Sequence, residues 1–281
     1  MGGKTAIRRR HAFPFIRKTL PLTLKYMKKI PEVTLLFWVM KICATTLGET
    51  AGDQLAQTMQ VGYGTSSLIL IGIFLFTLVV QLSVNRYIPA LYWAVILATS
   101  TAGTTLSDYM DRTLELGYAT GSALLIAILL VILGLWRQSE KSLSVNQITS
   151  RRGELFYWAA ILISNTLGTA LGDFLADDSG LGFGGGALLI GSLLALVVVA
   201  HYYTRISGVL LFWIAFVLTR PFGATFGDLL TKSPEKDGLG FGTQGSSLIL
   251  FGMLVLLVLY ASFTQTPAAQ VQTRGGEDQP G

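Results

Sequence analysis

Long apolar blocks recur along the chain, each preceded by a stretch in which apolar and small polar residues are mixed. Four of these blocks contain no Asp, Glu, Lys or Arg and cover residues 66–84, 123–136, 187–200 and 247–260. A helix that crosses a bilayer needs about 20 predominantly apolar residues. With the mixed stretches counted as helices too, the pattern predicts an all-α integral membrane protein with eight transmembrane helices.

Four segments share one pattern, in which an aromatic-Trp pair is followed by an Asp 15 residues after the Trp. The four are Phe37-Trp38 with Asp53, Tyr92-Trp93 with Asp108, Tyr157-Trp158 with Asp173, and Phe212-Trp213 with Asp228. A Gly-aromatic pair then opens the second helix of each unit, at Gly62-Tyr63, Gly117-Tyr118, Gly182-Phe183 and Gly240-Phe241. Self-similarity of this kind is the signature of a repeat architecture. The chain is therefore predicted to contain four copies of a two-helix unit.

The spacing of the four aspartates indicates a duplication of a duplication. Successive aspartates are 55, 65 and 55 residues apart, so the two halves superpose with a shift of 120 residues. Because each unit has two spans, the units are predicted to be parallel repeats around a central axis along the membrane normal. We expect a membrane domain at residues 32–264, with repeats at residues 32–85, 87–138, 152–203 and 206–264.

Composition and charge agree with a membrane protein and indicate its orientation. The chain is 51% hydrophobic and 13% charged, with a formal net charge of +5. The segments that we place on the cytoplasmic side are the N-terminal arm, the turns at Arg86 and Arg205, the connection around residues 137–152, and the C-terminal tail. Together they hold 16 of the 21 basic residues, as expected for cytoplasmic loops. We expect a multi-pass protein of the bacterial inner (plasma) membrane with both termini cytoplasmic, a basic arm at residues 1–31 and a disordered tail at residues 265–281. The arm is interpreted as attracted to the lipid bilayer rather than to nucleic acid, since no nucleic-acid motif accompanies it.

The first helix of each unit carries a polar stripe. Residues four and eight positions before each Asp lie on the same helix face as that Asp. The stripes are Thr45/Glu49/Asp53, Ser100/Thr104/Asp108, Asn165/Thr169/Asp173 and Arg220/Ala224/Asp228. Three further threonines, Thr46, Thr101 and Thr166, flank them. The stripes predict a polar pathway along the axis of the four helices.

Small residues follow the same helices and predict close packing. Each Asp is preceded by Gly or Ser, with a further Gly four positions before that residue. The pairs are Gly48/Gly52, Gly103/Ser107, Gly168/Gly172 and Gly223/Gly227. This spacing lets helix backbones approach closely. Packing alone is a sufficient reason for these glycines, and it is compatible with a functional centre beside them.

The expected depth of the carboxylates leaves two explanations open. Each Asp lies 15 residues after its Trp, which is roughly 22 Å along a helix. If the tryptophans form an aromatic belt at the inner interface, the aspartates lie in the outer part of the bilayer core and Glu49 lies near its midplane. Either the aspartates are solvated in an outer vestibule, or they bind a cation or protons, as intramembrane acids commonly do.

Arg220 breaks the pattern, because its position holds a neutral polar residue in the other three units. A guanidinium at that depth needs partners, and the candidates are Glu49, Asp108 and Asp173. Its role is either a structural ion pair or a countercharge that a permeating cation displaces. Lys41 is expected to extend to the inner surface, without a role.

The residue types present favour a hard cation. Cys43 is the one cysteine, and His11 and His201 are far apart in the chain. Oxygen ligands suit Mg²⁺, Mn²⁺ or Ca²⁺ rather than Zn²⁺ or Cu⁺. The expected metal ligands are Asp53, Asp108, Asp173, Asp228 and Glu49. Apart from such a divalent cation, no cofactor is expected.

The first repeat resembles a bacterial family of uncharacterised four-repeat membrane-anchored proteins. The resemblance lies in residues 29–34 (Lys-Ile-Pro-Glu-Val-Thr), the Phe37-Trp38 pair and the segment from Thr45 to Asp53. The resemblance covers about residues 29–263 and rests on the Thr-x-Gly-Glu-Thr and Gly-Asp motifs. It implies an all-helical inner-membrane protein and implies no activity.

Two functions follow from the polar stripe. The first is a cation transporter that exports a divalent metal or is coupled to protons through a central acidic site. The second is a non-transporting membrane scaffold or sensor in which the stripe is structural. An enzyme is not expected, since the chain shows no nucleophile-base pair, no zinc-peptidase motif and no phosphate-binding loop with Lys. No feature indicates an oligomeric state.

Overall fold

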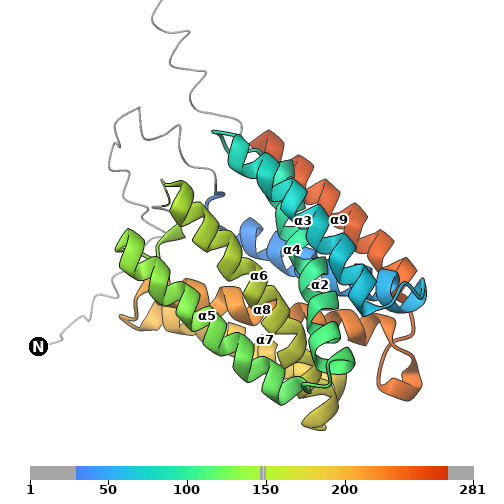
Figure 1. Cartoon of the computed structure of the whole chain (residues 1–281). Helices are drawn as coiled ribbons and strands as arrows, with labels where there is room; N and C mark the ends of the chain where they lie inside the picture. Colours follow the sequence, from blue (N-terminus) through green and yellow to red (C-terminus); the bar gives the residue numbers. More distant parts are fainter. Residues whose placement is uncertain (1–29, 146–147, 149, 265–281) are drawn as a thin grey trace, which may run out of the picture.

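The computed structural model describes residues 30–145, 148 and 150–264, and within these residues all regular structure is helical (Figure 1). The long helices are α2 (Leu35–Asp53), α3 (Tyr63–Ser83), α4 (Pro89–Asp108), α5 (Tyr118–Glu140), α6 (Arg151–Asp173), α7 (Gly182–Tyr203), α8 (Gly208–Thr231) and α9 (Thr243–Thr264). The prediction of an all-α chain with eight long helices is confirmed for this part of the chain. The predicted tail at residues 265–281 and nearly all of the arm at residues 1–31 lie outside the described residues.

Local sequence features explain where these helices begin. The Thr34 hydroxyl accepts a hydrogen bond from the Phe37 N–H at 3.4 Å, and the Ser150 hydroxyl accepts one from the Gly153 N–H at 2.8 Å. Pro89 stands in the first turn of α4, where its missing N–H has no helical partner to lose. Glycines with φ of 66–81° begin or directly precede the second helix of the first three units, at Gly62, Gly117 and Gly182. In these three units the glycine of the Gly-aromatic pair therefore has a positive φ, a backbone conformation that glycine adopts readily.

The polar helices α2, α4, α6 and α8 form a closed ring. Each packs against the next in chain order, and α8 packs against α2. The apolar helices lie outside this ring (Figure 1), and each packs mainly against the inner helix of the following unit: α3 on α4, α5 on α6, α7 on α8 and α9 on α2. The two helices of one unit are thus not an independent hairpin. Each unit buries its surface against its neighbours, as repeat units generally must.

Glycines on the inner helices lie directly against the neighbouring stripe. The first glycine of each unit faces the first stripe residue of the next unit, in the pairs Gly48/Ser100, Gly103/Asn165, Gly168/Arg220 and Gly223/Thr45. A Cβ at Gly103 would lie 2.9 Å from the backbone carbonyl carbon of Asn165. The second small position repeats the arrangement one turn later, in the pairs Gly52/Thr104, Gly172/Ala224 and Gly227/Glu49. These contacts bring the polar stripes together at the centre of the ring.

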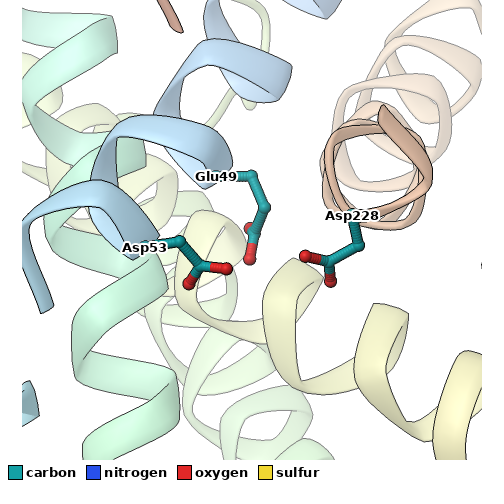
Figure 2. Close-up of side chains that lie close together, drawn as sticks. All are labelled: Glu49, Asp53 and Asp228. Atoms are coloured by element: carbon teal, nitrogen blue, oxygen red, sulfur yellow. The ribbon is translucent and has the colours of Figure 1, made fainter. Parts of the chain in front are cut away.

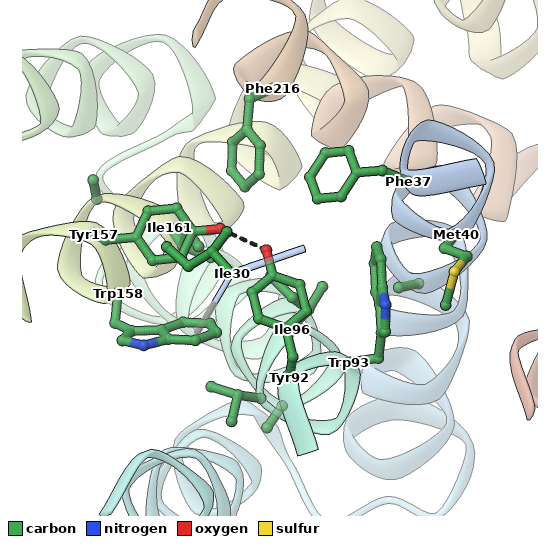
Figure 3. Close-up of a cluster of buried hydrophobic side chains, with 14 of the residues drawn as sticks. Ile30, Phe37, Met40, Tyr92, Trp93, Ile96, Tyr157, Trp158, Ile161 and Phe216 are labelled. Carbon is green, nitrogen blue, oxygen red and sulfur yellow. Dashed lines mark hydrogen bonds between the residues drawn. The ribbon is translucent and has the colours of Figure 1, made fainter. Parts of the chain in front are cut away.

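One end of the ring is filled by the aromatic pairs of the repeats (Figure 3). The first aromatic residue of one unit contacts the Trp of the next, with centroid distances of 5.7 Å for Phe37/Trp93, 5.6 Å for Tyr92/Trp158 and 5.8 Å for Phe212/Trp38. At the remaining junction Trp136 of α5 lies between Tyr157 and Trp213. The hydroxyls of Tyr92 and Tyr157 are hydrogen-bonded at 2.5 Å, as Figure 3 shows. We refer to these residues together with Phe216 as the aromatic layer.

The expectation that the repeat tryptophans form an interfacial belt is wrong for three of them. Trp93, Trp158 and Trp213 are at most 5% exposed. Each is enclosed because aromatic rings from neighbouring units pack against it edge-on or tilted, which are favourable geometries for aromatic pairs. The spacing from Trp to Asp therefore measures the length of the packed ring rather than a distance from a lipid interface.

Six helices in the described part of the chain are long and apolar enough to cross a membrane: α3, α5, α6, α7, α8 and α9. Helices α2 and α4 do not meet this test. Charged residues interrupt α2 at Lys41 and Glu49, and α4 is rich in Ser and Thr. These polar residues are buried within the ring. They lower the mean hydropathy of the two helices without contributing to the helix surface that faces outward.

We expect Gly103→Ala to destabilise the protein by about 1–3 kcal/mol, the usual cost of overpacking a close-packed site. The added methyl group would meet the backbone of α6, which cannot move aside as a flexible side chain can. The measurement is thermal unfolding of the purified protein. Gly134→Ala on α5 is the matched control, because a Cβ there meets no atom within 4 Å. Equal melting temperatures for the two variants would contradict the proposed close packing.

Candidate functional site

Arg220 of α8 and Glu49 of α2 form a buried ion pair at the centre of the ring. Nη1 of Arg220 lies 2.9 Å from Oε2 of Glu49, and the two side chains are 0% and 3% exposed. Nη2 donates to the hydroxyls of Thr104 at 2.6 Å and Thr169 at 2.7 Å. Both hydroxyls also lie within 3.3 Å of Glu49 Oε2. We refer to these four residues, one from each inner helix, as the central network.

Of the three partners expected for Arg220, the structure selects Glu49. Asp108 and Asp173 form ion pairs with another residue, Arg112. A buried ion pair is tolerated only when its geometry is good and its remaining groups are hydrogen-bonded. The guanidinium fork fulfils much of this requirement, because its two terminal nitrogens contact three of the four helices.

Lys232 joins two of the four aspartates one helical turn beyond Glu49. Its ammonium lies 2.6 Å from Oδ2 of Asp53 and 3.2 Å from Oδ1 of Asp228. Burial by itself would lower the pKa of Lys232, but attraction to Asp228 and Asp53 outweighs it and holds this pKa above its ordinary value. Gln57 donates a further hydrogen bond to Asp53 at 2.6 Å. Lys232 is 19% exposed, so it covers this pair from the solvent side.

Arg112 joins the other two aspartates in the same way. Its Nε lies 3.1 Å from Oδ1 of Asp108, and its Nη2 lies 3.0 Å from Oδ2 of Asp173. Arg112 and Lys232 each follow the Asp of their own unit by four residues, and each reaches the Asp of the following unit. Sequence reasoning gave these two cations no role. The four-residue spacing from an Asp, which places both groups on one helix face, is the signal that identifies them.

Glu49, Asp53 and Asp228 form a group of three buried carboxylates that could together hold a metal ion. Figure 2 shows the three side chains from α2 and α8 converging on one point. Each offers an oxygen that lies within 4.8 Å of those of the other two. Oδ1 of Asp228 is buried, and the Lys232 ammonium lies 3.2 Å from it. We refer to these three residues as the acidic triad.

The predicted ring of five metal ligands is therefore divided in two. Asp108 and Asp173 lie together at the α4–α6 junction, bridged by Arg112. The shift of 120 residues that relates the two halves places Thr169 where Glu49 stands. The second pair consequently has a threonine where the first has Glu49, and among the described residues a set of three carboxylates that could hold a metal is found on one side of the ring.

Lys41 is buried instead of extending to a surface, so that expectation is wrong. Its ammonium donates to Asn165 Oδ1 at 3.3 Å and lies 4.1 Å from the centroid of the Phe216 ring. Asn165 in turn donates to the Thr99 hydroxyl at 2.9 Å. Lys41 is enclosed by α6 and α8 across the ring, and none of the described carboxylates forms an ion pair with it.

The remaining predicted pathway residues differ in their hydrogen bonding. The hydroxyls of Thr101 and Thr166 donate to carbonyl groups of their own helices. The Thr45 hydroxyl lies 3.0 Å from the Lys41 carbonyl and 3.3 Å from the Thr219 carbonyl of α8. The hydroxyls of Ser100 and Thr46 are buried without a hydrogen bond to any described residue. The Ser164 hydroxyl of α6 is buried in the same way.

The fold and the site define a class of protein: an all-helical chain with membrane-compatible helices, built from four repeats that enclose a charged centre. The chain belongs to the family described as Repeat of Unknown Function (DUF347), whose sequence model matches residues 36–87, 91–142, 156–207 and 211–266. The resemblance to a four-repeat family is confirmed by these matches. No curated protein and no solved structure matches the chain significantly.

Arg220→Met is expected to lower the free energy of unfolding by about 3–5 kcal/mol, because it leaves Glu49 buried without its cation. Adding Glu49→Gln should recover part of this loss, since the double variant removes both charges. Unfolding of the two single variants and the double variant gives the coupling energy as a double-mutant cycle. Arg86→Met, on the exposed turn between α3 and α4, is the control. Additive effects of the two substitutions would contradict a shared central network.

We expect Lys41→Met to preserve or raise stability, by up to about 1–4 kcal/mol, the range reported when buried charges are replaced by apolar groups of similar volume. Lys41 has no carboxylate partner among the described residues, and the methionine would keep the contact with Phe216. The same unfolding assay provides the measurement. A loss of several kcal/mol would show that the hydrogen bond to Asn165 stabilises the ring.

Proposed function

We propose that this protein is a membrane transporter that exchanges a hard divalent cation of the Mn²⁺, Mg²⁺ or Ca²⁺ class for protons. The observation that carries the proposal is the acidic triad, in which three buried carboxylates from α2 and α8 each offer an oxygen within 4.8 Å of those of the other two. The Lys232 ammonium bridges two of these carboxylates, Asp53 and Asp228, from a partly exposed position. Three carboxylates drawn together beside one displaceable ammonium are what a site for an exchangeable cation requires.

The proposed setting is a bilayer crossed by all eight helices. The outer helices expose large apolar side chains such as Leu68, Leu188, Leu196 and Leu256, and contiguous apolar surface of this kind favours lipid contact. Helices α2 and α4 carry their polar residues toward the ring. Basic residues on helix ends and connections lie at the end of the aromatic layer, namely Arg137, Lys141, Arg151, Arg152 and Arg205. The positive-inside rule then supports cytoplasmic termini in a bacterial inner membrane.

The donor set favours hard cations. The acidic triad supplies carboxylate oxygens. Such ligands suit Mg²⁺, Mn²⁺ and Ca²⁺. Lys232 occupies the position beside Asp53 and Asp228, so a bound cation would displace its ammonium toward the solvent.

The charges of the site support exchange with protons. Five carboxylates, namely Glu49 and the four aspartates, lie next to three cations: Arg112, Arg220 and Lys232. With all groups ionised, each cation-bridged aspartate pair keeps one negative charge in excess. The two pairs together therefore carry two negative charges in excess, which one divalent cation or two protons would neutralise, and an uncompensated charge at such a depth is costly.

Access to the site differs at its two ends. Arg112 and Lys232, whose side chains are 35% and 19% exposed, cover the aspartates at one end. At the other end the aromatic layer, including the bonded Tyr92/Tyr157 pair, closes the ring. Transport would require the two cations to move aside at one stage and the aromatic layer to open at another. We expect the direction to be export.

The rival function is a scaffold or sensor that moves no ion. The observation that favours it is that each carboxylate of the ring already has a cation partner: Arg220 for Glu49, Lys232 for Asp53 and Asp228, and Arg112 for Asp108 and Asp173. A structural network would have this form. The two functions differ in whether the acidic triad binds a cation.

We expect Asp228→Asn to weaken Mn²⁺ binding by about tenfold or more, the effect of losing about 1.4 kcal/mol of binding free energy. The measurements are Mn²⁺ titration of the purified protein at acidic and alkaline pH, and the Mn²⁺ content of cells that express it. Binding should release protons and weaken at acidic pH. Asp173→Asn is the matched comparison, because this aspartate is equally buried but lies outside the acidic triad.

Glu235→Gln, on an exposed loop, is the control for general surface charge. If wild-type protein binds none of Mn²⁺, Mg²⁺ and Ca²⁺, or if Asp228→Asn and Asp173→Asn lower stability equally without affecting binding, the transporter proposal fails and the scaffold function is favoured.

A further inference from the structure

A cavity of about 560 Å³ opens between α2, α7 and α8, away from the acidic triad. It lies at the junction of the fourth and first units, where the ring closes. Its walls include Trp38 and Ile42 of α2, Leu194 and Val198 of α7, and Phe212 and Ala215 of α8. Leu143, Ser144 and Val145 of the α5–α6 connection complete it at the end of the aromatic layer. This volume is within the range of ordinary ligand pockets.

The lining determines what kind of molecule can occupy the cavity. It is predominantly apolar, and of its few polar groups Thr34, Ser144, His201 and Tyr202 lie close to the ends of the helices, whereas Thr219 lies within α8. Apolar cavities do not hold ordered water and do bind apolar molecules. The α7 wall continues into an exposed apolar face that includes Leu196, Val198 and Val199. An elongated apolar chain could therefore enter from the lipid side of α7.

Basic residues flank the polar end of the cavity. Arg205 stands in the short turn between Tyr202 and Gly208, both of which line the cavity, and Lys141 stands two residues before Leu143. Both cations are exposed. Basic groups at the ends of membrane helices attract anionic lipid headgroups. Apolar walls with cations at one end match the chemistry of an anionic phospholipid.

We propose that this cavity binds one acyl chain of an anionic phospholipid, whose headgroup contacts Arg205 and Lys141. The lipid would bridge α7 of the third unit, α8 of the fourth and α2 of the first. It would thereby support the α8–α2 contact, where the Thr45 hydroxyl reaches the Thr219 carbonyl. This site is independent of the acidic triad, and it rests on the membrane placement proposed above rather than on cation transport.

The test uses full-length protein stripped of lipid in detergent, with phosphatidylglycerol as the probe and phosphatidylcholine as the zwitterionic comparison. Native mass spectrometry counts bound lipid, and thermal unfolding reports its effect. We expect one tightly bound phosphatidylglycerol that raises the melting temperature. Phosphatidylcholine should bind about tenfold more weakly, the effect of losing one well-placed ionic contact.

Ala195→Trp is the variant that fills the cavity, and Ala127→Trp is its matched control. Both alanines are exposed on outer helices, but only Ala195 lines the cavity. We expect Ala195→Trp to abolish tight binding, Ala127→Trp to retain it, and Arg205→Gln to remove the preference for phosphatidylglycerol.

Several results would overturn the proposal. They are undiminished lipid binding by Ala195→Trp, equal binding of the two lipids by wild-type protein, and binding that appears only after residues 1–29 are deleted. The last result would identify the chain's own N-terminal arm as the occupant. Because neither alanine belongs to the acidic triad, loss of lipid binding with intact Mn²⁺ binding separates this inference from the proposed transport.

Discussion

Burial of the Arg220 guanidinium among four helices is the constraint on which the rest of the ring depends. A charge without solvent needs partners on every side, and here they come from α2, α4 and α6. Those partners are within reach only because Gly168 and its equivalents let the inner helices touch. The charged centre therefore depends on close packing of the helix backbones.

The molecule combines three levels of symmetry. Its backbone repeats four times, with equivalent helix contacts around the ring. Its bridging cations repeat twice, as Arg112 and Lys232 in the second and fourth units. Its acidic triad occurs once among the described residues, because Glu49 has Thr169 as its counterpart in the other half. A repeat protein can thus acquire a single specialised site when side chains differ between units whose backbones are equivalent.

The distribution of polar groups is the reverse of that in a soluble protein. Charged and hydroxyl side chains fill the centre, and large apolar side chains cover the outer helices. In such a protein the interior polar groups supply specific hydrogen bonds, and association of the helices depends on packing of small residues. The cavity at the α8–α2 junction is the place where this packing is incomplete, and it opens toward the apolar exterior.

The sequence by itself determined the all-helical fold, the four repeats, and the residues that share each polar face. These properties are local, since helical periodicity and repeat spacing are readable along the chain. It did not determine which carboxylates meet, that Lys232 and Arg112 each join two aspartates, or that Lys41 and three of the repeat tryptophans are enclosed. Those results depend on how each helix is rotated and which neighbour it meets. Only the closed ring, with α9 returning to α2 and α8 packed against α2, brings residues 49, 53 and 228 together.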